Sequence, residues 1–250
     1  MSGARGAAAS HDTRCGTLRP ATRGVSMRAV RPFKIAAVAV LATAPWAVLV
    51  AGPLHAGLGP TCFANAVSVP ATNGPDLLVG TAGFDIIAGL DGADVIKGKG
   101  GGDFLCGNRG GDTINGGTGA DMIQGGQGGD TLNGDTGADL VLGGPGADDA
   151  AGGPGIDLVG GGNGNDKLRG GPGMDSVTGG AGGDDINGGR GNDGLSGQTG
   201  NDTIRGGTGN DVLIGGPGAN DFGAGGPGPL DFCDATTIEN IGPGCEITNP

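Results

Sequence analysis

The chain has 250 residues, of which 63 are glycine, and a formal net charge of −12 at pH 7. From Gly57 onward it contains no His, Trp or Tyr, which excludes Ser-His and Cys-His catalytic pairs and HExxH zinc sites. Because these catalytic pairs are missing, we expect no enzymatic activity. An acidic chain repels nucleic acid and anionic membranes, so we expect neither as a partner.

The amino-terminal region has the features of an export signal. Residues 1–26 carry no pattern and are either an unstructured lead or a mis-assigned start. Met27 is followed by basic residues and then by an apolar run over residues 35–50 that ends in small residues. This arrangement predicts a cleaved signal peptide over 27–56, a secreted, extracellular or cell-surface protein, and no membrane insertion after cleavage. An uncleaved anchor is the alternative, but the run is short of the ~20 residues that a membrane span needs.

The remainder of the chain is more acidic than the whole. Residues 1–56 hold seven Lys/Arg and one acid, so their removal leaves seven bases and twenty-five acids, a charge of −18. Twenty-three of these acids are Asp and two are Glu. This bias indicates short carboxylates held close to the backbone of tight turns.

Residues 71–223 contain a repeat of nine residues. An aspartate recurs at a constant spacing of nine, with a glycine two residues before it and an apolar residue two residues after it. The unit reads G-G-x-G-x-D-x-U-x, where U is apolar, and a fixed period this short predicts a solenoid. The sixteen aspartates are Asp76, Asp85, Asp94, Asp103, Asp112, Asp121, Asp130, Asp139, Asp148, Asp157, Asp166, Asp175, Asp184, Asp193, Asp202 and Asp211.

Each unit divides into a turn and a strand. The segment G-G-x-G-x-D suits a turn because glycine adopts positive φ values, and x-U-x suits a three-residue strand with U pointing inward. One inward residue cannot bury a core alone, so we expect two repeats per coil, with residues eighteen apart stacked at about 4.8 Å. The predicted fold is an all-β solenoid, and disorder is the alternative for the metal-free chain.

This stacking lines up the aspartates of alternate units along each edge. Like charges repel at this spacing, and one apolar side chain per unit contributes only about 1.5–3 kcal/mol. Ordering nine residues costs about 1–2 kcal/mol for each residue. A divalent cation between coils would remove the repulsion, and six or more carboxylate and carbonyl oxygens suit Ca²⁺ better than Mg²⁺ or Zn²⁺. We therefore expect the sixteen aspartates to bind calcium in up to about fourteen sites, since eight carboxylates per edge leave seven gaps.

The repeat is imperfect in places. The second glycine is replaced in seven units, which makes those turns uncertain, and Ala150 leaves a thin point in the core. In a seventeenth unit Asn220 stands at the aspartate position, Asp221 is displaced by one, and Phe222 is at the apolar position. The replacements of the second glycine are Thr72, Thr81, Leu90, Lys99, Asn108, Asp135 and Gln198.

Four cysteines follow the signal, and they allow three disulfide connectivities, with free thiols as the alternative. Residues 57–70 and 224–250 lack the repeat and are predicted to form the amino-terminal and carboxy-terminal caps. If Leu105 points inward, Cys106 should face outward and meet Cys62 in the first cap. Cys233 and Cys245 lie close together beyond the last full repeat. This placement favours the pairs Cys62–Cys106 and Cys233–Cys245.

The units resemble the hemolysin-type calcium-binding repeats of the RTX family. Residues 116–123 read G-G-T-G-A-D-M-I and residues 206–213 read G-G-T-G-N-D-V-L. The resemblance implies a parallel β-roll that binds calcium between its turns and folds outside the cell. With its four cysteines the chain looks like small, secreted, disulfide-capped repeat proteins of bacteria. We expect a structural or cell-envelope role, and the alternative is an extracellular adhesin or ligand-binding module, since nothing in the sequence marks or excludes a ligand surface.

Overall fold

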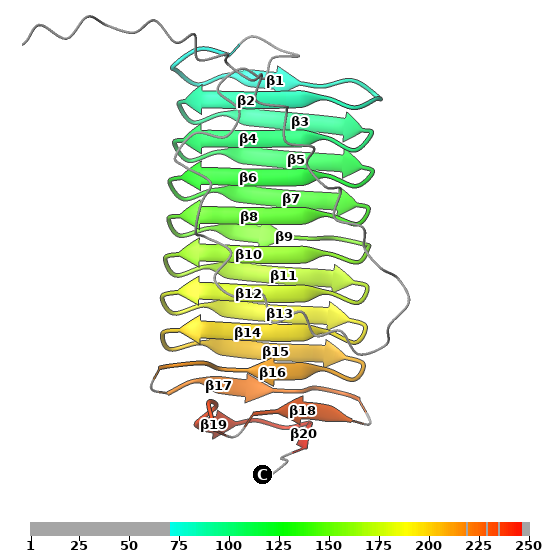
Figure 1. Ribbon diagram of the computed structural model, residues 1–250, viewed down its shortest axis with the longest axis vertical. Coiled ribbons are helices and arrows are strands. Elements are labelled where there is room, and N and C mark those ends of the chain that lie inside the picture. Colours follow the sequence, from blue (N-terminus) through cyan, green and yellow to red (C-terminus); the bar gives the residue numbers. More distant parts are fainter. Residues whose placement is uncertain (1–70, 219, 229, 235, 247–250) are drawn as a thin grey trace, which may run out of the picture. The chain divides into compact units, whose positions relative to one another are not determined.

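A computed structural model describes residues 71–218, 220–228, 230–234 and 236–246. All regular elements of these residues are β-strands, and they form a parallel β-roll (Figure 1). Among them we find no helix with the length and apolarity that crossing a membrane requires. The predicted lead, signal peptide and amino-terminal cap, residues 1–70, lie outside the described residues and stay predictions.

The strands alternate between two ten-stranded sheets, so that consecutive strands lie on opposite sides of the roll (Figure 1). The first sheet, called sheet A, contains β1 (Leu77–Val79), β3 (Val95–Gly100), β5 (Thr113–Thr118), β7 (Thr131–Thr136), β9 (Asp149–Ala151), β11 (Lys167–Pro172), β13 (Asp185–Arg190), β15 (Thr203–Thr208), β17 (Phe222–Ala224) and β19 (Asn240–Ile241). The second, sheet B, contains β2 (Ile86–Asp91), β4 (Phe104–Arg109), β6 (Met122–Gln127), β8 (Leu140–Pro145), β10 (Leu158–Asn163), β12 (Ser176–Ala181), β14 (Gly194–Thr199), β16 (Val212–Ile214), β18 (Asp231–Cys233) and β20 (Cys245–Glu246).

Strand pairing follows the repeat. Each strand pairs in parallel with the strand two further along the chain, and in the regular part the partners are eighteen residues apart, as in Val159↔Val177 and Leu168↔Ile186. Eighteen residues are two repeats, so each coil contains one strand of each sheet. The predicted all-β parallel β-roll with two repeats per coil is therefore confirmed.

The strands are longer than the sequence predicts. Most have six residues instead of three, because pairing continues through the two glycines and the residue after them, as in Gly162↔Gly180 and Asn163↔Ala181. Glycine offers no side chain to interrupt the ladder, and its backbone groups still pair. The turn proper is therefore reduced to the last glycine, one residue and the aspartate.

The core is a stack of single apolar side chains. Each unit places its U residue inside, and these residues are at most 2% exposed. Ala150 is also fully buried, paired with Leu132 and Leu168 of the neighbouring coils. The members of the stack are Leu78, Ile87, Ile96, Leu105, Ile114, Ile123, Leu132, Val141, Ala150, Val159, Leu168, Val177, Ile186, Leu195, Ile204 and Leu213, followed by Cys233 and Ile238.

Most of the irregular turns keep the conformation of the regular ones. Five residues that replace the second glycine, Leu90, Lys99, Asn108, Asp135 and Gln198, have φ values of 67–82°, in the left-handed region where Gly117 has 113°. A non-glycine residue in this region costs about 1–2 kcal/mol. The stacked coils therefore impose the turn conformation against the local preference of these residues.

The seventeenth unit differs from the prediction. Asp221, and not Asn220, occupies the aspartate position, and Phe222 faces outward while Gly223 pairs with inward-facing Ile204. The prediction that Asn220 and Phe222 hold these two positions is wrong. The unit has one extra residue before its aspartate, and the strand register is kept because a one-residue slip would turn its inward face outward.

The cysteines after the last regular repeat extend the roll at its carboxy-terminal end. The structure contains the predicted Cys233–Cys245 disulfide, with Cys233 fully buried at the end of the core stack. Cys106 is disulfide-bonded and lies outside the core stack, yet it is also fully buried. Its predicted partner, Cys62, lies outside the described residues, so the Cys62–Cys106 pair stays a prediction.

Candidate metal centre

The aspartates form two ladders, one along each edge of the roll. In both ladders the Oδ1 atom of each aspartate accepts a hydrogen bond from the backbone N–H of the aspartate one coil earlier. The first ladder runs from Asp76 to Asp202 and the second from Asp85 to Asp211. The N–Oδ1 distance between successive aspartates of each ladder is 2.7–2.9 Å. The structure thus brings all sixteen predicted residues into two continuous columns.

The other carboxylate oxygen, Oδ2, points to the first glycine of its own unit. A Cβ atom built on Gly116 would lie 2.4 Å from Asp121 Oδ2 and 2.7 Å from the carbonyl oxygen of Gly134, which belongs to the next coil. No real side chain tolerates such contacts, so this position requires glycine. The same geometry places a carboxylate oxygen and a carbonyl oxygen of the next coil around one small space.

These carboxylates are buried and incompletely bonded. From Asp85 to Asp211 each ladder aspartate is at most 4% exposed. In the described residues, sixteen buried Oδ2 atoms, from Asp94 to Asp231, have no hydrogen-bond partner. A buried polar atom without a partner costs about 1–3 kcal/mol, and more when it is charged. The row of Oδ2 atoms therefore lacks a positively charged partner.

Burial shifts the ionisation of the ladders. Desolvation, the largest cause, raises the pKa of Asp139 from 3.8 to about 7, although the N–H of Asp121 opposes the shift, and repulsion from Asp157 and Asp121 adds to it. The pKa is also raised to about 7 at Asp148, Asp184 and Asp193, and to about 6 at Asp112, Asp157, Asp202 and Asp211. It is raised in addition at Asp94, Asp103, Asp121, Asp130, Asp166 and Asp175. Without a cation, the fold resists full ionisation of the ladders.

The donor set fits calcium. The oxygens that converge are carboxylate Oδ2 atoms and backbone carbonyls, which are the ligands that Ca²⁺ prefers. Within the described part of the chain, no three His, Cys, Asp or Glu side chains come close enough to form a metal site on their own. A cation would therefore be held by one carboxylate ladder together with the carbonyls of the turns.

The first coil differs from the others. The backbone N–H and the hydroxyl of Thr72 donate to Asp76 Oδ2 at 2.7 and 3.0 Å, and Thr81 donates in the same way to Asp85 Oδ2 at 2.6 and 3.0 Å. The two threonines replace the second glycine of their units. The structure therefore gives Oδ2 of Asp76 and Asp85 protein donors, which the Oδ2 atoms of the later aspartates lack.

The ladders also continue past the predicted residues. Asp221 and Asp231 are 0% and 1% exposed, and their Oδ1 atoms accept from the N–H groups of Asp202 and Asp211 at 2.8 and 3.0 Å. Reasoning from a constant spacing of nine missed both. The signal was present in the sequence, because residues 215–218 and 225–228 each read G-G-P-G and are followed by an aspartate one place later than usual.

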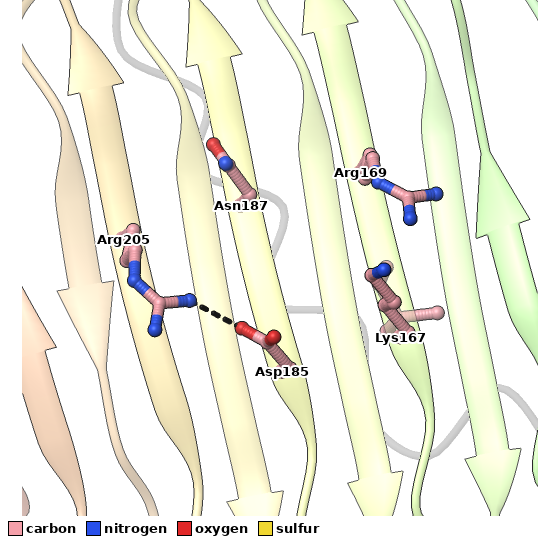
Figure 2. A pocket seen from close by; sticks show the side chains of 6 residues that line it. Lys167, Arg169, Asp185, Asn187 and Arg205 are labelled. Atoms are coloured by element: carbon pink, nitrogen blue, oxygen red, sulfur yellow. Dashed lines mark hydrogen bonds and ion pairs between the residues drawn. The ribbon is translucent and has the colours of Figure 1, made fainter.

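A second polar feature lies on the outer face of sheet A. Lys167, Arg169, Asn187 and Arg205 surround Asp185 and line a shallow pocket with Leu168 (Figure 2). Arg205 pairs with Asp185, and Arg169 pairs with Asp149 at 2.6 Å, with side chains that are 41–51% exposed. Such exposed pairs contribute little to stability. We call these five polar residues, Lys167, Arg169, Asp185, Asn187 and Arg205, the basic patch.

Comparison with known protein families matches the chain to the RTX calcium-binding nonapeptide repeat (4 copies), at residues 70–105, 107–141, 124–159, 160–195 and 196–226. These segments cover more than half of the chain and include all sixteen predicted aspartates and Asp221. Asp231 lies outside them. No curated protein matches the chain.

Proposed function

Because the chain belongs to the family of RTX calcium-binding nonapeptide-repeat proteins, we propose that its β-roll folds when calcium fills the two aspartate ladders. The ligands would be the sixteen predicted aspartates, together with the carbonyl oxygens of the turns. Calcium would supply the positive charge that the buried carboxylates lack.

The row of sixteen unpartnered Oδ2 atoms carries this proposal. The apolar core receives only one side chain from each unit, so it offers little to offset a buried, unpaired carboxylate in nearly every unit. A ligand that binds the folded chain and not the unfolded chain adds its binding free energy to the free energy of unfolding. The ladders exist only when the coils are stacked, so calcium selects the folded state.

We also propose that the protein is secreted and folds outside the cell. The Cys233–Cys245 disulfide supports this, since structural disulfides persist in oxidising compartments. Extracellular calcium modules typically work at about 10⁻⁴–10⁻³ M calcium, so a chain of this kind would stay unfolded before export and fold afterwards. The role would be structural or at the cell envelope, and not enzymatic, because each buried aspartate is already part of a ladder.

Circular dichroism of the purified chain during a calcium titration tests calcium-dependent folding. We expect weak β-structure in excess chelator at pH 8 and a cooperative gain of β-structure with Ca²⁺. Mg²⁺ should be less effective, because it demands a smaller octahedral site. Full β-structure in chelator, unchanged by calcium, would overturn the proposal.

The basic patch favours a second candidate function, the binding of an anionic ligand as an adhesin or ligand-binding module would require. Three cationic side chains line one pocket in a chain whose net charge is −12, and an anion would compete with Asp149 and Asp185 for Arg169 and Arg205. Arg169, Asn187 and Arg205 occupy equivalent positions on three neighbouring strands, with Asn187 on the middle strand. Two strand spacings separate the arginines by about 9.6 Å, so one elongated polyanion could contact both.

Binding of a sulfated or carboxylated oligosaccharide to the calcium-loaded chain tests this second function. The double variant Arg169→Gln/Arg205→Gln should lose salt-dependent binding, whereas Arg109→Gln, on sheet B, should retain it. Equal binding by both variants would exclude the basic patch as the ligand surface.

A further inference from the structure

We propose that the carboxy-terminal tail, residues 236–246, completes two further calcium sites at Asp221 and Asp231, and that the Cys233–Cys245 disulfide holds the second one closed. This inference rests on the proposed calcium binding of the ladders. It extends that binding to residues that depart from the nonapeptide and, for Asp231 and the tail, lie outside the family matches.

Asp221 and Asp231 have the same surroundings as the regular aspartates. Each is buried, each uses Oδ1 to accept the backbone N–H of the preceding rung, and each has an Oδ2 atom without a partner. Both belong to ten-residue units, so the extra residue has been absorbed in the turn. The unpartnered Oδ2 atom is therefore present at Asp221 and Asp231, although their units depart from the nine-residue motif.

The tail supplies the carbonyls that the next coil would otherwise provide. In the last regular unit, a Cβ on Gly206 would lie 2.4 Å from Asp211 Oδ2 and 2.5 Å from the carbonyl oxygen of Gly225. At Gly215 the corresponding atoms are Asp221 Oδ2 at 2.6 Å and the carbonyl oxygen of Thr237 at 2.5 Å.

The second edge shows the same replacement. A Cβ on Gly225 would lie 2.6 Å from Asp231 Oδ2 and 2.7 Å from the carbonyl oxygen of Gly244. Thr237 and Gly244 are not part of a nonapeptide repeat, yet their carbonyls take the places of first-glycine carbonyls. Both terminal positions thus pair an unpartnered carboxylate oxygen with a carbonyl, as in the interior of the roll.

Several contacts fix the carbonyl of Thr237. The Thr237 hydroxyl accepts the N–H of Gly215 at 3.1 Å. The neighbouring Ile238 is 2% exposed and fills the core space next to Gly223, where a Cβ would lie 2.7 Å from its Cδ1 atom. Glu239 Oε2 accepts the N–H of Asp221 at 2.7 Å and so ends the first ladder.

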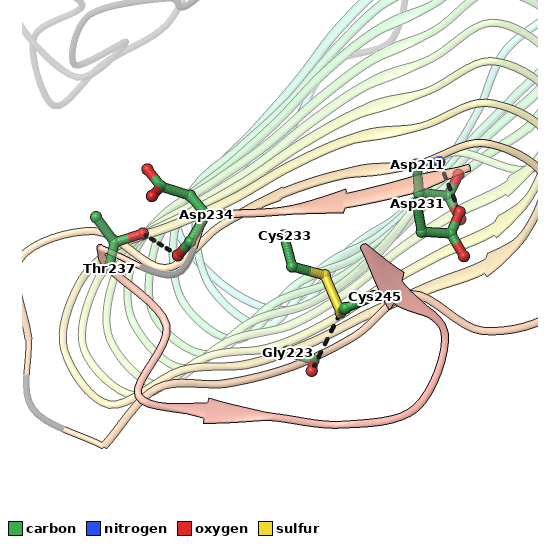
Figure 3. Close-up of a disulfide and its surroundings, with 7 residues drawn as sticks. All are labelled: Asp211, Gly223, Asp231, Cys233, Asp234, Thr237 and Cys245. Carbon is green, nitrogen blue, oxygen red and sulfur yellow. Dashed lines mark hydrogen bonds between the residues drawn. A yellow bond between two sulfur atoms is a disulfide. The ribbon is translucent and has the colours of Figure 1, made fainter. Parts of the chain in front are cut away.

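The carbonyl of Gly244 depends more on the disulfide. Gly244 precedes Cys245, which is bonded to Cys233 at the end of the core (Figure 3). Strand β20 has only two residues, paired with β18 through Asp231↔Cys245 and Phe232↔Glu246. Figure 3 shows the disulfide between the Asp211–Asp231 pair and the turn that contains Asp234 and Thr237. Reduction would therefore release Gly244 from Asp231, while Ile238 still anchors Thr237.

Counting the calcium ions bound per chain at saturation, by equilibrium dialysis of the oxidised full chain, tests the two sites. Asp221→Asn and Asp231→Asn should each lose about one ion. Glu246→Gln, which removes an exposed carboxylate from the same tail, should lose none. Reduction of the wild-type chain should remove about one ion, and reduction of Asp231→Asn should remove no more.

Hydrogen exchange of the wild-type chain gives a second measurement that needs no variant. We expect calcium to protect the amides of residues 231–246 in the oxidised chain and to protect them less after reduction, while β5–β12 stay protected. Unchanged ion counts in Asp221→Asn and Asp231→Asn, or calcium-independent protection of the tail, would refute the terminal sites. Failure of the wild-type chain to bind any calcium would instead refute the proposed function.

Discussion

Replacement of Asp139 by asparagine separates the two roles of a ladder carboxylate. The amide oxygen of asparagine can still accept the N–H of Asp121, which Asp139 Oδ1 accepts at 2.8 Å. The negative charge at the unpartnered Oδ2 position is lost. The substitution therefore keeps the hydrogen-bond ladder but replaces the proposed calcium ligand, Oδ2, by an uncharged amide nitrogen that cannot bind the ion.

The expected loss follows from the burial of the site. Removing one partner of a buried charge pair costs about 3–5 kcal/mol, so the free energy of unfolding in saturating calcium should fall by about that amount. If about fourteen ions bind cooperatively, this loss raises the calcium concentration at the folding midpoint only about 1.4- to 1.8-fold. Denaturation in saturating calcium is therefore the more sensitive assay.

Asp135→Asn is the matched control for Asp139→Asn. It removes the same charge from the same unit, but Asp135 is partly exposed, has a left-handed φ of 67°, and bonds to Asn133 instead of belonging to a ladder. We expect a change within about 0.5 kcal/mol. Equal destabilisation by Asp135→Asn and Asp139→Asn in calcium would refute the reasoning.

Three further predictions follow from the ladders. In chelator, β-structure should be greatest at and below about pH 4 and should decline as the pH rises to about 7. The reason is that burial raises the pKa of Asp139, Asp148, Asp184 and Asp193 from 3.8 to about 7, so the folded chain holds protons that the unfolded chain has lost. Calcium affinity should rise over the upper part of the same pH range, and circular dichroism with calcium titrations at several pH values checks both predictions. Gly116→Ala should cost about 1–3 kcal/mol or more, because its Cβ would meet Asp121 Oδ2 and the Gly134 carbonyl, whereas Gly194→Ala, with open space around its Cβ, should be neutral or stabilising in the same denaturation assay. Asn220→Ala should change the calcium midpoint less than Asp221→Ala, because it costs only the strain of alanine at the left-handed φ of 75° and removes no carboxylate, and equal effects would contradict the observed register.

The constant period explains why much of the fold could be predicted. An aspartate and an apolar residue that recur in phase every nine residues determine which side chains stack, so the two-repeat coil, the two edges and the core stack followed from the sequence. The period also identified all sixteen predicted ladder residues, because their position depends only on register. The sequence did not show that pairing continues through both glycines, since glycine alone predicts a turn.

The nine-residue period could not predict the structure of the irregular units at the ends of the roll. The shift from Asn220 to Asp221 depends on the turn absorbing an extra residue so that Gly223 stays inward, which is a consequence of stacking and not of local preference. The donors that Thr72 and Thr81 give to the first aspartates, and the carbonyls of Thr237 and Gly244, arise only from the folded ends. Irregular end coils therefore carry contacts that a repeat motif cannot reveal.

The anomalous scattering of calcium in crystals of the oxidised, calcium-loaded chain tests the central claim most directly. The ladders predict calcium peaks between successive coils along both edges, each about 2.3–2.6 Å from an aspartate Oδ2 atom and from turn carbonyls. A folded roll in calcium whose Oδ2 atoms contact only water or protein groups, with no calcium peak along either edge, would contradict the claim that calcium completes the ladders.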